Sequence, residues 1–315
     1  MSAQTRLGSN LRPTRSVSVP TGTEPDSEND RRRSPSRWFS PTLGAAMTQA
    51  LPQRAPTRQV DLSGVPLFLY NLWYWPYLML TCALMFLPAL VIWAAVTPFD
   101  RRRRLLGKYT RRWGTHYLDG VPFASVTVYH RERAVDIGPV VFVSNHLSLS
   151  DVLALFKLDY PFLWVSKVEN FYAPFLGWNM WLNNYVALKR GYLPSIMRMY
   201  RTCIRRLAEG HSLFIFPEGT RSPDGELQYF HAGAFRMAIR NNVPIVPIVI
   251  EGTREVLAKG KLRVKPLPVW VEVLEPIRGC DAGNDWKALR SLTQARMRQA
   301  QRELRRSLGR LPSSE

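Results

Sequence analysis

The chain has 315 residues, enough for one sizeable domain with smaller attachments, because single hydrophobic cores stop growing near ~250 to 300 residues. Its 43 Lys and Arg residues against 24 Asp and Glu residues give a formal net charge of +19, which favours a negatively charged partner such as nucleic acid, an anionic membrane or a phosphorylated substrate. The cysteines Cys82, Cys203 and Cys280 are far apart and odd in number, which argues against a disulfide framework and against a zinc site.

Residues 1–60 form the first predicted segment. They are rich in Arg, Ser, Pro and Thr, include the run Arg31, Arg32 and Arg33, and contain no apolar stretch of the kind found in signal peptides. Such a composition is typical of a disordered tail, which we exclude from the predicted fold.

Residues 61–100 form the second segment and have membrane-like composition. No charged residue occurs from Leu62 to Phe99, and the stretch is nearly twice the ~20 residues that one membrane-spanning helix needs. It therefore predicts one membrane helix, or a hairpin of two shorter helices, which the prolines Pro76 and Pro88 favour. Arg101 to Arg104 follow at once, which places the next residues on the cytoplasmic face of a bacterial-type inner membrane. The alternative is a buried helical hairpin in a soluble protein.

Residues 101–283 alternate short β-branched runs with helical stretches, which predicts an α/β domain with a mixed, largely parallel sheet flanked by helices. The predicted strands are Ser125 to His130, Val140 to Ser144, Phe162 to Ser166, Tyr185 to Leu188, Ser212 to Phe216, Val243 to Ile250 and Val269 to Leu274. The predicted helices are Asp151 to Lys157, Pro194 to Glu209 and Ala232 to Asn241. Residues 284–315 predict a basic C-terminal helix, which lies either against a membrane or in solvent.

A histidine and an aspartate follow the second predicted strand. The segment Ser144 to Asp151 reads SNHLSLSD, and a strand-to-helix loop would fold the side chains of His146 and Asp151 together. A carboxylate that accepts a hydrogen bond from one imidazole nitrogen leaves the other nitrogen free as a general base. Such a pair suits acyl transfer to a hydroxyl, although a capped turn with a hydrogen-bonded histidine is an equal alternative on this segment alone.

The segment FPEGTRS, Phe216 to Ser222, follows the predicted strand at 212–216. Pro and Gly force a turn that presents Glu218 and Arg221 at the carboxyl end of a strand, where α/β folds usually bind ligands. The planar guanidinium of Arg221 suits a phosphate, and Glu218 could hold a substrate hydroxyl. A surface turn with a local ion pair is the structural alternative.

Together the two segments resemble the glycerolipid acyltransferase family, which includes bacterial 1-acylglycerol-3-phosphate acyltransferases. The NHxSxxD box of that family matches Asn145, His146, Ser148 and Asp151, and its FPEGTRS box matches Phe216 to Ser222 without a gap. Lys189 and Arg190 resemble its basic box. One departure is His231, which stands where many members of the family have lysine.

The resemblance implies a membrane-bound O-acyltransferase. His146 would act as base and Asp151 would orient it, while backbone N–H groups after Asn145 would stabilise the oxyanion. The expected substrate-binding residues are Asn145, Ser148, Lys189, Arg190, Glu218, Gly219, Thr220 and Arg221. The expected acceptor is lysophosphatidic acid, and the donor is acyl-CoA or acyl carrier protein. No metal and no bound cofactor are expected, and no nucleic acid; the sequence predicts no oligomeric state.

Other functions were weighed against this one. Another lysolipid or glycerol-3-phosphate is an alternative acceptor. A serine hydrolase using Ser148 or Ser150 is disfavoured because the chain lacks a G-x-S-x-G motif. A basic protein that only binds a membrane surface or nucleic acid is disfavoured, because aromatic residues are not interleaved with basic ones and the uncharged segment of residues 62–99 stays unexplained.

Overall fold

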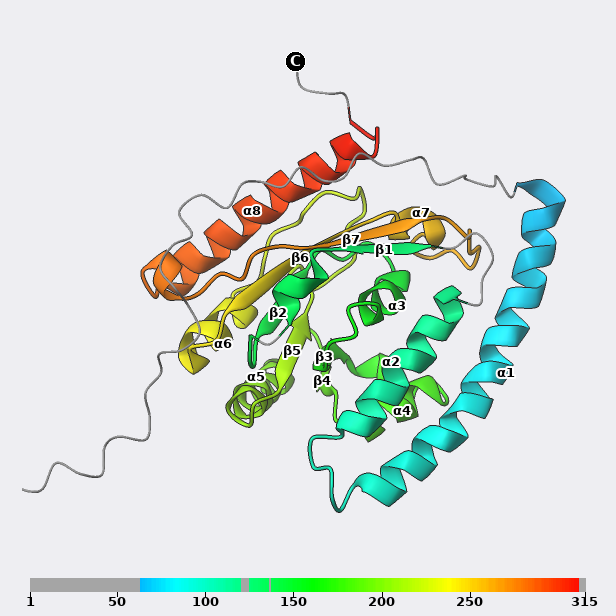
Figure 1. Ribbon diagram of the computed structural model, residues 1–315, viewed down its shortest axis with the longest axis horizontal. Helices are drawn as coiled ribbons and strands as arrows, with labels where there is room; N and C mark the ends of the chain where they lie inside the picture. The colour runs from blue at the N-terminus through cyan, green and yellow to red at the C-terminus, as the bar shows by residue number, and fades with distance from the viewer. Residues whose placement is uncertain (1–62, 120–124, 136, 312–315) are drawn as a thin grey trace, which may run out of the picture. The chain divides into compact units, whose positions relative to one another are not determined.

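The computed structural model describes residues 63–119, 125–135 and 137–311. The predicted tail of residues 1–60 lies outside these ranges. One sheet of seven strands runs in the order β1-β7-β6-β2-β5-β3-β4 (Figure 1). Its strands are β1 (Val126–Tyr129), β2 (Val141–Ser144), β3 (Phe162–Lys167), β4 (Val186–Leu188), β5 (Ser212–Ile215), β6 (Ile245–Glu251) and β7 (Val269–Val273).

The sheet is mixed and mostly parallel, as predicted. Every neighbouring pair is parallel except β6 and β7, which run antiparallel. The central strands β2 and β6 are buried along their whole length, which is why they consist almost entirely of Val, Ile and Phe rather than alternating with polar residues. All seven predicted strand ranges overlap an observed strand.

Helices cover both faces of the sheet. On one face, α5 (Leu193–Ala208), α6 (Gly233–Asn241) and α8 (Trp286–Ser307) contribute to one apolar core. On the other face, α3 (Ser150–Phe156) and the short helix η1 (Arg131–Ala134) pack over a second core. The remaining short helices are α4 (Leu176–Leu182), α7 (Thr253–Val256), η2 (Val168–Tyr172) and η3 (Cys280–Ala282).

The C-terminal helix α8 takes an arrangement that neither sequence alternative anticipated. Leu289, Met297 and Leu304 are fully buried, and the helix lies along the sheet against β6 and α6 (Figure 1). Asp285 caps its first turn by accepting a hydrogen bond from the Ala288 amide at 3.0 Å. Most of its basic residues therefore occupy the outer face of a helix whose apolar face completes the core, whereas Arg305 is paired with the buried Glu251.

The uncharged segment forms one helix, α1 (Gly64–Val96), which contains both Pro76 and Pro88. The hairpin alternative is therefore not formed. By length and composition, α1 is the one helix among the described residues that could cross a membrane. It packs against α4 and against α2 (Arg104–Asp119), a helix that the sequence analysis did not predict. Trp113 and Tyr117 of α2 are buried in the core that the two helices share.

Candidate active site

The candidate residues follow strands that end at one edge of the sheet. His146 follows β2, the segment 218–221 follows β5, and Lys189 follows β4, and these strands are related by parallel pairings through β3. β5 is the direct neighbour of β2, whereas β4 is three strands away, or about 14 Å at the usual strand spacing. The two boxes are therefore adjacent, and the basic residues 189 and 190 lie farther along the same edge.

His146 and Asp151 are hydrogen-bonded to each other. The turn between β2 and α3 brings His146 Nδ1 to 2.7 Å from Asp151 Oδ2, and the Asp151 side chain is completely buried. The same carboxylate oxygen accepts the backbone N–H groups of Leu147 at 2.7 Å and Ser148 at 2.9 Å. Nδ1 of His146 is thereby the donor to Asp151, which leaves Nε2 as the ring nitrogen that can take a proton.

These bonds correct one expectation. The backbone N–H groups that follow Asn145 were expected to stabilise an oxyanion, but those of Leu147 and Ser148 already donate to Asp151. They hold the carboxylate in place instead. Two amide donors and an imidazole on one oxygen make an orienting group that is itself rigid.

The His146 ring is also fixed from its face. The Phe216 ring stacks on it with centroids 4.1 Å apart and planes 16° apart, and Trp164 stacks on Phe216 in turn at 5.7 Å. The Ser222 N–H donates to the His146 carbonyl at 2.7 Å, which ties the second box to the first. Phe216 and Ser222 had no predicted role of their own, although both stand inside the FPEGTRS segment. Their contacts depend on β2 and β5 being neighbours.

Asn145 and Ser148 do not lie where substrate contact would place them. The Asn145 amide bonds the backbone of Ile250 twice, donating to its carbonyl at 2.9 Å and accepting from its N–H at 2.8 Å. The Ser148 hydroxyl donates to the Leu257 carbonyl at 2.6 Å. Both side chains already have backbone partners, so a positioning role fits them better than the expected substrate contact.

The same contacts argue against a serine nucleophile. Ser148 is fully buried, and the Ser150 hydroxyl donates to Ser148 Oγ at 3.0 Å rather than facing His146. The side chain to which the His146 ring is hydrogen-bonded is that of Asp151. A serine hydrolase needs the hydroxyl within hydrogen-bond reach of the imidazole, and neither serine makes that bond here.

Glu218 is a buried carboxyl group with no hydrogen-bond partner among the described residues. It is 4% exposed, and both of its oxygens lack a partner. Burial raises its pKa to about 8, with a smaller contribution in the same direction from the carboxylates of Asp151 and Asp224 and an opposing one from the backbone N–H groups of His146 and Gln228. A buried group left unsatisfied next to His146 is suited to bind a substrate hydroxyl.

This pKa predicts how stability changes with pH. The folded carboxyl keeps its proton up to about pH 8, whereas the unfolded one loses it near its ordinary value of 4.5. The stability that the protonated Glu218 contributes is therefore complete below pH 4.5 and is lost as the pH rises through 8, by roughly 3 to 5 kcal/mol. In Glu218→Gln this loss should disappear. Urea unfolding of both proteins in detergent at acid and alkaline pH measures it; equal pH slopes would contradict the assignment.

The rest of the FPEGTRS segment forms a turn at the surface. Gly219 has a φ of +68°, and a Cβ added there would lie 3.1 Å from the His231 ring, so a larger residue fits neither the backbone nor the space. Thr220 is exposed and Arg221 is half-buried. Arg221 makes no ion pair with any described residue, which leaves its guanidinium available to an anion. The missing lysine is replaced by His231, whose ring lies against Gly219.

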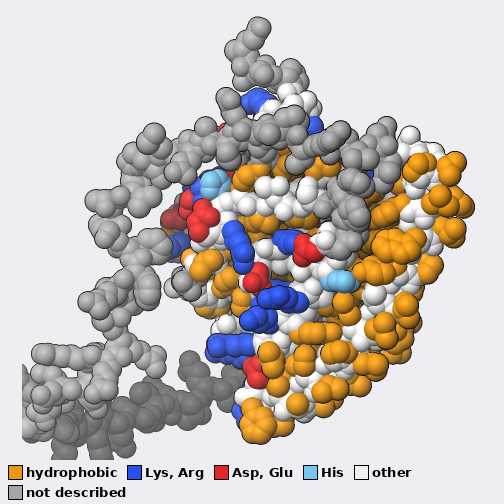
Figure 2. Space-filling model, turned by 45° about the vertical axis from the view of Figure 1, so that its right-hand side comes forward, with side chains coloured by type: hydrophobic (Ala, Val, Ile, Leu, Met, Phe, Trp, Pro, Cys, Tyr) orange, Lys and Arg blue, Asp and Glu red, His pale blue; other side chains and the backbone are white. Residues whose placement is uncertain are grey.

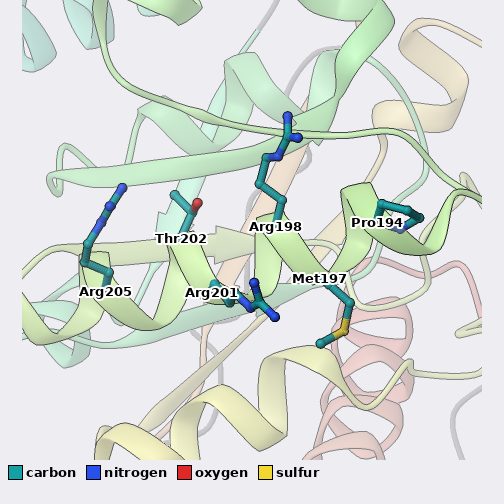
Figure 3. Close-up of a pocket in the computed structure, with 6 residues that line it drawn as sticks. All are labelled: Pro194, Met197, Arg198, Arg201, Thr202 and Arg205. Carbon is teal, nitrogen blue, oxygen red and sulfur yellow. The ribbon is translucent and has the colours of Figure 1, made fainter.

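Lys189 and Arg190 are both exposed at the end of β4. The helix that follows them, α5, continues the positive charge. Figure 3 shows Arg198, Arg201 and Arg205 extending from successive turns of α5, around a hollow of about 560 Å³. The residues that line this hollow belong to α5 and not to either box, so it is not the site of the proposed chemistry. It shows that the basic surface at the end of β4 extends along this helix.

Comparisons with known proteins bear on the region that contains both boxes. Residues 125–251 match the family model described as Acyltransferase. A 1-acyl-sn-glycerol-3-phosphate acyltransferase of Chlamydomonas reinhardtii is 34% identical over 221 residues, 69% of this chain and 65% of that protein. A chloroplastic 1-acyl-sn-glycerol-3-phosphate acyltransferase of Arabidopsis thaliana is 41% identical over 164 residues, 51% of this chain and 46% of that protein. The chain thus spans between about half and two thirds of these relatives.

A solved structure shows the same fold. The crystal structure of the 1-acyl-sn-glycerophosphate acyltransferase PlsC from Thermotoga maritima superposes with a TM-score of 0.64. The match covers 79% of this chain and 98% of that chain, at 23% sequence identity. At this identity the likeness concerns the fold, the mixed sheet with flanking helices.

Proposed function

We propose that this chain acylates the sn-2 hydroxyl of lysophosphatidic acid and so makes phosphatidic acid for phospholipid synthesis, which the match of residues 125–251 to the Acyltransferase family model supports. The donor is a fatty acyl thioester, acyl-CoA or acyl carrier protein. The observation that carries the proposal is the bond between His146 Nδ1 and the buried Asp151, with the FPEGTRS turn held against it. The matched relatives bear the name of this activity.

The proposed reaction is direct transfer between two substrates. Nε2 of His146 removes the proton from the acceptor hydroxyl as its oxygen attacks the thioester carbonyl. The tetrahedral intermediate then collapses, the carbon–sulfur bond breaks, and the thiolate takes the proton from the imidazolium. Asp151 stabilises the imidazolium and keeps the ring in one tautomer. The acyl group is already activated as a thioester, so the reaction needs no metal and no bound cofactor.

The acceptor is held by its phosphate and its glycerol. We assign the phosphate to Arg221, Lys189 and Arg190, since the described residues form no ion pair with Arg221 or Arg190 and a guanidinium binds phosphate through two parallel hydrogen bonds. We assign the glycerol to Glu218, whose protonated carboxyl can both donate and accept. The exposed Thr220 and the Gly219 turn complete this side of the site.

An acceptor series tests this function. The purified protein in detergent is given labelled acyl-CoA or acyl carrier protein with lysophosphatidic acid, glycerol-3-phosphate, lysophosphatidylcholine or monoacylglycerol. We expect phosphatidic acid to form fastest, and monoacylglycerol, which has no phosphate, to react far more slowly. Transfer to a different lysolipid would replace the acceptor while keeping the reaction. Absence of transfer to every acceptor with both donors would refute the proposal.

We also propose that α1 attaches the protein to one leaflet of a membrane rather than spanning it. One side of α1 is exposed and apolar, as Figure 2 shows over much of this surface. The other side contacts the α/β domain from Leu67 to Ala89, a length of about 33 Å at the rise of an α-helix, and both of these residues are buried. At the N-terminal end the Asn71 amide bonds the Val264 backbone twice. A spanning α1 would draw the charged helix α2 into the ~30 Å hydrocarbon layer.

The position of the two ends of α1 tests this arrangement. In a Cys280→Ala background, whose other cysteines are buried, Ser63→Cys and Phe99→Cys place single thiols at the two ends. With an impermeant maleimide added to sealed vesicles, both thiols should react from the same side, which we predict to be the cytoplasmic side of a bacterial-type inner membrane. Reaction from opposite sides would show that α1 spans the bilayer.

A further inference from the structure

A cavity of about 500 Å³ opens at the edge of the sheet opposite to His146. Its walls include the residues that precede β2 and β5 and the beginning of β3, namely Pro139, His211 and Phe162. The volume is in the range of small-molecule sites, and the walls join apolar rings to polar groups in the way such sites do. No residue of the NHxSxxD or FPEGTRS segments lines it.

Positive charge gathers at this cavity. Arg102, Arg103, Arg104 and Arg111 all line it. Arg111 is neutralised by Asp159 at 3.1 Å, but Arg102 and Arg104 have no acidic partner among the described residues. Guanidinium groups therefore outnumber carboxylates at this cavity, and a bound anion would balance their positive charge.

His211, in the wall of the cavity, is affected by the positive charge of these arginines. Burial lowers the pKa of His211, and the positive charges of Arg206, Arg102 and Arg104 lower it further, while Glu209 alone opposes them. Burial and the charge of Arg206 likewise lower the pKa of Arg103. Its guanidinium donates to the backbone carbonyls of Trp181 and Leu182, which fixes it at the wall. Arg103 is thus a half-buried, positioned charge in the wall, whereas Arg102 and Arg104 are exposed at its mouth.

The surroundings of the cavity indicate where its ligand comes from. The arginines 102–104 follow the C-terminal end of α1, and they are flanked by Phe99, which is 90% exposed, and Leu105, which is 51% exposed. Exposed apolar side chains beside a basic cluster are typical of a segment at the surface of an anionic membrane. Figure 2 shows Lys and Arg side chains gathered beside the apolar surface.

We propose that this cavity is a second lipid site, which binds the phosphate headgroup of an anionic phospholipid at the membrane surface and is separate from the acyl-transfer site. Arg102 and Arg104 bind the phosphate at the mouth, and Arg103 supplies the positive charge of the wall behind them. The lipid holds the C-terminal end of α1 at the membrane. The choice of a lipid over a soluble phosphate rests on the membrane attachment proposed for α1.

The test compares two double variants that change charge equally. Arg102→Gln/Arg104→Gln alters the cavity, and Arg296→Gln/Arg302→Gln removes two exposed arginines from α8. Binding is measured by co-sedimentation with phosphatidylcholine vesicles that contain either phosphatidic acid or, at matched surface charge, oleate, which has a carboxylate in place of phosphate. Wild type should prefer the phosphatidic acid vesicles. The cavity variant should lose this preference, by about tenfold or more in affinity, and the α8 variant should keep it.

Each other outcome overturns part of the proposal. Equal losses in both double variants, or an equal loss on oleate vesicles, would reduce the effect to general surface charge. If vesicle binding were unchanged while inorganic phosphate raised the Tm of wild type but not of the cavity variant, the ligand would be a soluble phosphate and the lipid assignment would be wrong. Acyl transfer in detergent should persist in both variants, so failure of this site is distinguishable from failure of the acyltransferase proposal.

Discussion

His146→Ala is expected to lower kcat by about 10³- to 10⁴-fold, with only a small change in KM for the acceptor. The side chain supplies the proposed base, and its Nδ1 bond to Asp151 leaves Nε2 for the hydroxyl. The alanine removes the base while the surrounding hydrogen bonds of Asn145 and Ser148 keep the loop in place. Steady-state transfer to lysophosphatidic acid measures both constants.

A histidine outside the site is the matched control. His130 lies at the N-terminal end of η1 with a φ of +54°, a conformation that asparagine accepts well. His130→Asn should therefore transfer acyl groups as wild type does. If His146→Ala kept more than about a tenth of wild-type kcat, it would not be the general base, because such catalysis contributes at least about a hundredfold.

Asp151→Asn is expected to lower kcat by about 10²- to 10⁴-fold, the second largest effect. One oxygen of Asp151 accepts the imidazole and two backbone N–H groups, so asparagine keeps the shape but replaces the charge by a dipole. A neutral amide stabilises the imidazolium less, and its NH₂ group favours the wrong tautomer of His146. The substitution also weakens charge-assisted hydrogen bonds, which we expect to cost about 1 to 3 kcal/mol of unfolding free energy.

The two effects of Asp151→Asn are separable. Urea unfolding gives the loss of stability, and single-turnover transfer gives the loss in the chemical step for the folded protein. Asp285→Asn is the control, because asparagine caps a helix about as well as aspartate, and it should change neither quantity greatly. A variant that lost stability but kept kcat would show that Asp151 only supports the fold.

Much of the fold follows from local patterns in the sequence. The apolar run at 140–143 can be buried on both faces only as a central strand, and β2 occupies that place. The predicted helices at 151–157 and 232–241 likewise overlap α3 and α6. By contrast, α2 has charged residues throughout and was not predicted. Its Trp113 and Tyr117 are buried because they pack against α1, a contact that the local sequence of α2 does not indicate.

The amino-acid sequence by itself predicted the type of chemistry, because each of the two boxes, Asn145 to Asp151 and Phe216 to Ser222, is a short continuous run of the chain. The tertiary structure alone decided which side chains meet. In it the Asn145 amide bonds the backbone of β6, the Phe216 ring stacks on His146, and α8 packs into the core. These contacts join segments up to 105 residues apart, as between Asn145 and Ile250. Local propensity and spacing do not encode such pairs; strand order does, because it places the ends of β2, β5 and β6 side by side.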